Sequence, residues 1–331
     1  MGWKGTVRAI NAAAKKAERN AKKSQRELAL RHKEYAKMQE LEQAAYDVEF
    51  FENYIEIVQS MHKECGDSIN WEKVAVIAEP NKPIFIKGLE SEAISQKEQY
   101  QPSFFDRLFK RIENKLRVLD VAIESAKKQD QINFELSLEK WQQNYKEWAE
   151  SVEQANLLIA GEPEARINTI KELNPFSELD TLGSSLHFSV LENYLLTINI
   201  NIRGADIIPN EQKSLLKSGK LSVKKMPVGK FNELYQDYVC SSVLRVARET
   251  FAILPDEFVL INATDKLLNK VTGYLEEQTI LSVYVSRSTL DSLNMDLIDP
   301  SDSMRNFIHN MSFKPTKGFE PVVPVDVVTL A

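Results

Sequence analysis

The chain has 331 residues, of which 43% are hydrophobic and 27% are charged. This composition is typical of a globular protein with one or two cores and excludes a disordered chain. No apolar run approaches the ~18 residues of a membrane-spanning helix, and the N-terminus lacks the apolar stretch of a secretory signal. The sequence contains two cysteines, Cys65 and Cys240, which favours a reducing compartment, so we expect a cytoplasmic protein.

The net charge of -6 is unevenly distributed along the chain. Residues 1–33, the basic arm, carry ten basic and two acidic side chains, a net charge of +8, which leaves -14 for the rest. We predict that the arm is helical and binds nucleic acid or an acidic protein surface, because such partners would neutralise its charge. The predicted contact residues are Lys15, Lys16, Arg19, Lys22, Lys23 and Arg26. A membrane is the weakest alternative because the apolar face of the arm is small, and a solvated helix end with no partner is a further one.

Apolar residues recur at steps of three and four between residues 38 and 58, and the first proline is Pro80. This spacing predicts one long helix over residues 6–63, with Gly66 just beyond its end. The prolines and glycine of residues 66–102 indicate a connection, with a short helix at 71–78 and an extended piece at 84–86.

A second helical pattern begins after Pro102 and reaches about residue 152. Its polar stretch, residues 124–133, is expected to project into solvent or to mark a bend. Two long amphipathic helices joined by a connection predict an antiparallel, coiled-coil-like helical hairpin. We expect residues 38–58 to pack on residues 105–119 or on residues 141–152 of the second helix, within the same chain or with a second copy. The hairpin would also bind a protein partner or form a homo-oligomer. The aromatic stripe consists of Trp141, Tyr145 and Trp148.

The pattern of predicted secondary structure changes after residue 160, where short strands and helices follow one another. The fold class that we predict is therefore α+β, with a helical hairpin domain at residues 1–160 and a smaller mixed α+β domain at 161–331 that folds by itself. Helices are predicted at residues 164–173, 211–218, 230–251 and 288–293 and after Asp299, and strands at 185–189, 194–202, 258–263 and 279–285. The last two strands are expected to pair as a hairpin.

Sequence signals for chemistry are weak. Lys217-Ser-Gly-Lys220 has too few glycines for a phosphate-binding loop, and we interpret it as a helix end and a turn. His62 and Cys65 are spaced like half of a zinc site, but no second pair of ligands is apparent. Ser184 near His187 lacks the sequence around a catalytic serine. We therefore expect no cofactor and no metal.

These observations predict a non-enzymatic interaction or scaffold protein, an accessory subunit of a larger assembly. The alternative is a metal-dependent nuclease that uses Asp256, Glu276 and Glu277 at the ends of paired strands. That hypothesis requires the three carboxylates to lie within about 8 Å of one another, because they would share one divalent ion. A weaker set, Asp206 with Glu211, is explained by the start of a helix.

Overall fold

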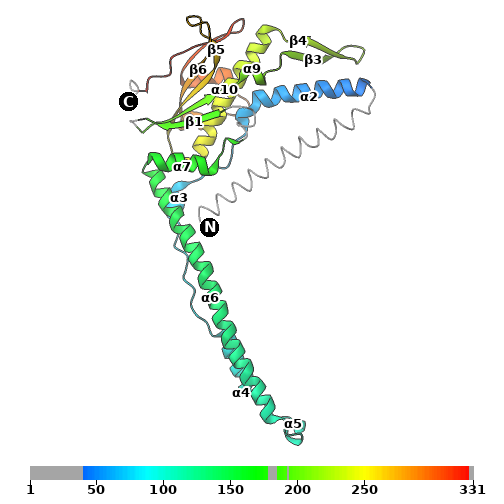
Figure 1. The fold of residues 1–331 in the computed structure, drawn as a ribbon, viewed down its shortest axis with the longest axis vertical. Helices are drawn as coiled ribbons and strands as arrows, with labels where there is room; N and C mark the ends of the chain where they lie inside the picture. The colour runs from blue at the N-terminus through cyan, green and yellow to red at the C-terminus, as the bar shows by residue number, and fades with distance from the viewer. Residues whose placement is uncertain (1–39, 178–184, 192–193, 328–331) are drawn as a thin grey trace. The chain divides into compact units, whose positions relative to one another are not determined.

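The computed structural model describes residues 40–177, 185–191 and 194–327, and these form two compact units (Figure 1). Residues 73–154 form one unit, here called the stalk. Residues 40–72 and 155–327 form the other, here called the sheet unit. The basic arm, with all six of its predicted contact residues, lies outside the described residues.

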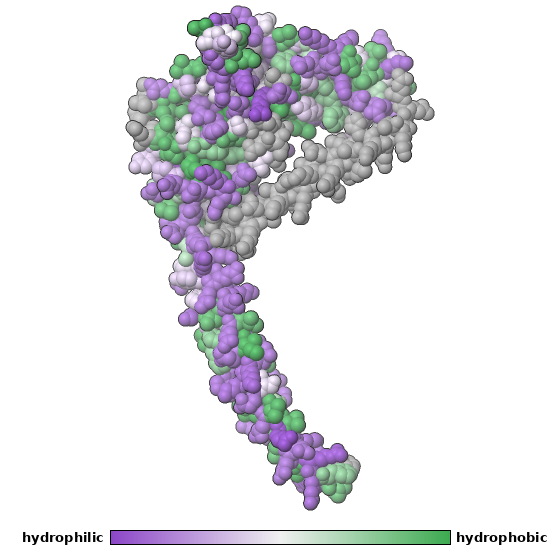
Figure 2. Space-filling view, viewed as in Figure 1, coloured by the Kyte–Doolittle hydropathy of each residue, from purple (hydrophilic) through white to green (hydrophobic). Residues whose placement is uncertain are grey.

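The stalk is built on one continuous helix and a chain segment that runs along it. Its elements are α4 (Gly88–Glu98), α5 (Phe104–Leu108) and α6 (Ile112–Ile159), preceded by α3 (Trp71–Ala75). The polar stretch at residues 124–133 lies inside α6 and does not interrupt it. Figure 2 shows that hydrophilic side chains cover much of the stalk surface, as expected for a helix with a narrow apolar stripe.

The aromatic stripe of α6 packs on the chain segment before α4. The indole of Trp141 donates to the carbonyl of Pro80 at 2.9 Å, and that of Trp148 donates to Ile77 at 2.7 Å. Asp130, in the middle of the polar stretch, accepts hydrogen bonds from two backbone N–H groups at the start of α4. The packing of residues 38–58 on residues 105–119 or on residues 141–152, within the chain or with a second copy, stays a prediction.

In the described residues, the sheet unit joins helices of several sizes to a six-stranded sheet. The helices are α2 (Glu40–Ser60), α7 (Pro163–Leu173), α9 (Gly204–Ile207), α10 (Val228–Ile253) and α11 (Arg287–Asp291), with short turns η1 (Met61–Lys63), α12 (Pro300–Ser303) and η2 (Met304–Asn306). The strands are β1 (Ser185–Val190), β2 (Leu196–Asn201), β3 (Glu211–Leu215), β4 (Leu221–Lys225), β5 (Phe258–Leu268), β6 (Leu275–Ser286), β7 (Ile308–Lys314) and β8 (Gly318–Glu320).

The sheet has the order β1-β2-β5-β6-β7-β8, and β3 and β4 form a separate pair. Strands β2 and β5 are parallel, so the chain must cross over between them, and the crossover contains α10. The remaining neighbours are antiparallel, and β5 and β6 form the predicted hairpin. Mixed helix and sheet content confirms the α+β class.

The core of the sheet unit forms where α10 packs against the sheet. Fully buried side chains of α10 include Val243 and Leu244, and those of the strands include Ile198, Ile261 and Val283. Helix α2 and turn η1 also pack on α10. Residues 40–72 therefore share a core with the C-terminal half of the chain.

Two local predictions in this unit are wrong. Residues 211–215 form β3 instead of a helix, because Gly219, at φ +80°, makes the turn of a hairpin with β4. The helix after Asp299 ends at Asn306, and residues 308–314 form β7. Among the described residues, no helix combines the length and apolar character that crossing a membrane requires.

Candidate functional site

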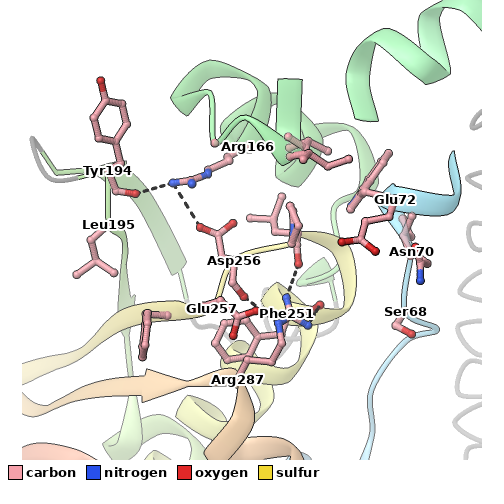
Figure 3. Close-up of a pocket in the computed structure, with 18 of the residues that line it drawn as sticks. Ser68, Asn70, Glu72, Arg166, Tyr194, Leu195, Phe251, Asp256, Glu257 and Arg287 are labelled. Atoms are coloured by element: carbon pink, nitrogen blue, oxygen red, sulfur yellow. Dashed lines mark hydrogen bonds and ion pairs between the residues drawn. The ribbon is translucent and has the colours of Figure 1, made fainter. Parts of the chain in front are cut away.

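A pocket of about 790 Å³ lies in the sheet unit, between the residues that precede α3, the start of α7 and the C-terminal end of α10 (Figure 3). Five charged residues line it, and two of them are Glu72 and Glu257. The other three interact with one another or with the same loop although they come from distant parts of the sequence. Arg166 comes from the first turns of α7, Asp256 from the loop between α10 and β5, and Arg287 from the junction of β6 and α11.

Arg287 closes the C-terminal end of α10. Its guanidinium donates to the backbone carbonyls of Phe251 and Leu254 at 2.9 and 2.6 Å, and to that of Asp256 at 2.9 Å. It also lies over the Phe251 ring, 4.7 Å from the centroid. A cation at this place is favourable because the last carbonyls of a helix lack partners and carry partial negative charge. Arg287 therefore fixes the loop that presents Asp256.

Arg166 and Asp256 form a buried ion pair. Their nearest nitrogen and oxygen atoms are 3.3 Å apart, and their side chains are 11% and 6% exposed. The same guanidinium nitrogen donates to the carbonyl of Tyr194, which has a positive φ of 62°. Gly161 lies so close that a Cβ atom there would be 2.9 Å from Arg166. The sequence Gly161-Glu-Pro therefore combines a helix start with space for the arginine.

Each partner of this pair keeps one buried polar atom without a hydrogen bond. These atoms are Nε of Arg166, a donor, and Oδ2 of Asp256, an acceptor. A buried polar atom left unpaired costs about 1–3 kcal/mol, so such atoms are rare in folded proteins and require an explanation. Both residues line the pocket, and Figure 3 shows that their side chains point toward each other beside it.

Opposing effects act on the pKa of the Asp256 carboxyl. Burial raises the pKa of the Asp256 carboxyl, and the guanidinium groups of Arg166 and Arg287 limit that rise. The carboxylate thus has two cations near it, while the end of α10 adds partial negative charge.

The walls of the pocket add apolar and aromatic surface. The rings of Phe258 and Tyr284 are stacked with 5.2 Å between their centroids, and both line the pocket. Trp71 is buried there and donates to the carbonyl of Ile253. The lining thus combines these rings with polar and charged side chains, so the pocket offers both apolar surface and hydrogen-bonding groups. Among the described residues that line the pocket there is no histidine or cysteine.

The structure does not bring the three predicted nuclease carboxylates together. Asp256 precedes β5, whereas Glu276 pairs with Leu267 near the far end of that strand. Phe258 and Leu267 are nine residue steps apart along β5, and at a strand rise of ~3.3 Å this places them about 30 Å apart. Glu276 accepts hydrogen bonds from Asn269 and Thr272 in the hairpin turn. This distance removes the shared metal site, and the described residues contain no group of three potential ligands.

Other sequence candidates have structural partners. The Nδ1 atom of His62 lies 2.9 Å from the hydroxyl of Ser241, and burial lowers the pKa of that histidine. Burial, followed by the nearby Glu249 carboxylate, raises the pKa of Cys65 to about 11, and Cys240 is fully buried. Ser184 lies outside the described residues. Arg166 and Arg287 were not predicted as site residues, because the sequence around a single arginine does not indicate its partner.

Comparisons with protein-family models, with curated proteins and with solved structures find no match to this chain.

Proposed function

We propose that the chain is a non-enzymatic interaction protein, an accessory subunit of a larger assembly, whose pocket binds a neutral hydrogen-bonding group. One observation carries the proposal. A donor and an acceptor, Nε of Arg166 and Oδ2 of Asp256, are buried without partners beside one pocket. A group that accepts one hydrogen bond and donates another would satisfy both atoms.

A carboxamide meets this requirement best. It offers a carbonyl oxygen to Arg166 and an N–H to Asp256, and it carries no charge. A carboxylate would satisfy Arg166 but face Asp256, and an ammonium would satisfy Asp256 but face Arg166. The stacked rings of Phe258 and Tyr284 favour an aromatic or apolar body attached to the amide.

Three probes with the same ring test this preference: benzamide, benzoate and benzylammonium. Titration is followed through the side-chain Nε–H signal of Arg166 in a nitrogen-15 spectrum, assigned with Arg166→Lys. Benzamide should bind at least about tenfold more tightly than either charged probe, a difference of about 1.4 kcal/mol. Asp256→Asn should weaken benzamide binding, and Asp302→Asn, an exposed carboxylate in the same unit, should not. Equal binding of all three probes contradicts the proposal.

The basic arm supports a second part of this function, the binding of a polyanion. The observation is its net charge of +8 against -14 in the rest of the chain. In a gel-shift assay, binding to duplex DNA should weaken with salt by a log–log slope of about 0.9 for each neutralised phosphate. Replacing Lys15, Lys16, Lys22 and Lys23 with Gln should flatten that slope. Binding that does not change with salt would exclude nucleic acid as the partner.

A further inference from the structure

The end of the stalk where α5 meets α6, here called the stalk tip (residues 100–118), is a turn held by the hydrogen bonds and the ion pair of Asp106. Asp106 accepts hydrogen bonds from the backbone N–H and the hydroxyl of Ser103, at 3.0 and 2.8 Å, and from the hydroxyl of Tyr100. It also pairs with the ammonium of Lys115 at 2.8 Å. The buried carboxylate thus ties the residues before α5 to the first turns of α6. The chain reverses here through Lys110, which has a positive φ of 51°.

Large apolar side chains of the stalk tip face solvent. Phe104, Leu108 and Phe109 are 74%, 61% and 58% exposed. Val118, on the adjoining turn of α6, is also exposed. Figure 2 shows apolar surface gathered at the end of the stalk that carries α5. Single exposed apolar residues are common on proteins, but a contiguous group marks an interaction surface.

Cations surround these apolar residues. Residues 104–117 contain five basic and two acidic side chains, a net charge of +3. One of the two acids, Asp106, is already paired with Lys115. Arg107, Lys110, Arg111 and Arg117 are exposed, and the guanidinium of Arg111 lies over the Phe109 ring at 5.3 Å. The exposed charge of the tip is therefore strongly positive.

We propose that the stalk tip inserts its apolar side chains into the surface of an anionic lipid bilayer. Protruding rings and aliphatic chains with cations around them match the interface of such a membrane, where acyl chains accept the apolar groups and lipid phosphates attract the cations. A protein partner would instead need a preformed pocket for each protruding side chain. The described residues contain no helix able to span a membrane, and this attachment requires none.

The proposal is independent of the ligand pocket, and it concerns a different surface from the basic arm. Because the arm would itself be attracted to anionic lipid, the experiment uses the full chain with Lys15, Lys16, Lys22 and Lys23 replaced by Gln as its background. Co-sedimentation is measured with phosphatidylcholine vesicles and with vesicles that also contain phosphatidylglycerol. The background protein should bind the anionic vesicles and not the neutral ones.

Replacing Phe104, Leu108 and Phe109 with Ser should lower the partition coefficient at least about tenfold, because the inserted apolar area is lost. Lys110→Gln should lower it about fivefold, the equivalent of the ~1 kcal/mol that one basic residue contributes near an anionic surface. Leu136→Ser is the matched control, because Leu136 is equally exposed on α6 but lies outside the tip. It should leave binding unchanged.

Circular dichroism will show whether the triple variant remains folded. If the triple variant is unfolded, the single variants Leu108→Ser and Lys110→Gln are tested instead. The proposal is overturned if the background protein does not sediment with anionic vesicles, if the control variant reduces binding as much as the tip variants, or if binding to neutral and anionic vesicles is equal. Concentration-dependent dimerisation abolished by the triple variant, without lipid binding, would assign the tip to a second copy of the chain.

Discussion

Arg166→Met tests the ion pair on which the pocket depends. The substitution retains the apolar part of the side chain and removes the guanidinium, which pairs with Asp256 and donates to Tyr194. Both members of the pair are almost fully buried, so Asp256 would be left as an uncompensated charge. Breaking a buried pair in this way costs about 3–5 kcal/mol at neutral pH. The free energy of unfolding is measured by urea denaturation.

The same variant has a predicted pH dependence. Burial already raises the pKa of Asp256 in the folded protein, and loss of Arg166 raises it further. When a carboxyl has a higher pKa in the folded protein than in the unfolded chain, its ionisation disfavours folding. The free energy of unfolding therefore falls as the pH rises from the ordinary carboxyl pKa to the raised pKa, and it stays lower above that pH. Below that range the carboxyl is protonated in both states and the penalty disappears. The cost of Arg166→Met should therefore be smaller at about pH 5 than at neutral pH, by about 1.4 kcal/mol for each unit of additional shift.

A double variant separates charge from packing. Adding Asp256→Asn to Arg166→Met removes the stranded carboxylate, so the double variant should be more stable than Arg166→Met alone at neutral pH. A loss of stability that is the same at both pH values, or an added loss in the double variant, would refute the reasoning.

Three other predictions concern packing and reactivity. Gly204→Ala should destabilise the protein by about 3 kcal/mol in thermal or urea unfolding, because the new Cβ would lie 2.0 Å from the Tyr235 ring. Gly229→Ala is the control and should not destabilise the protein, because there is open space around Gly229 in α10. A thiol reagent at pH 8 should modify native Cys65 about 100-fold more slowly than an exposed cysteine, because the Cys65 pKa of about 11 leaves little thiolate. A reaction as fast as that of an exposed cysteine would contradict the raised pKa. Asp130→Ala should speed amide hydrogen exchange in the first turn of α4, where Asp130 accepts two backbone hydrogen bonds, and unchanged exchange would show that this cap is dispensable.

The sequence by itself determined the elements that bury one regular face. The spacing of apolar residues predicted α10, and runs of apolar residues bounded by turn residues predicted β5 and β6, because these patterns record burial directly. The helix start after Asp299 was also predicted, since an N-cap is a local interaction between a side chain and the next turn.

Only the tertiary structure decided which surfaces meet. The apolar stripe at residues 38–58 indicated burial, but not that its described part would pack on α10. Gly219 fits both a helix end and a hairpin turn, and pairing of β3 with β4 selected the turn. The pocket joins Arg166, Asp256 and Arg287, which are far apart in the chain. Asp256 could be singled out from sequence, but its partners could not, because the energy of a buried charge depends on neighbours that folding brings to it.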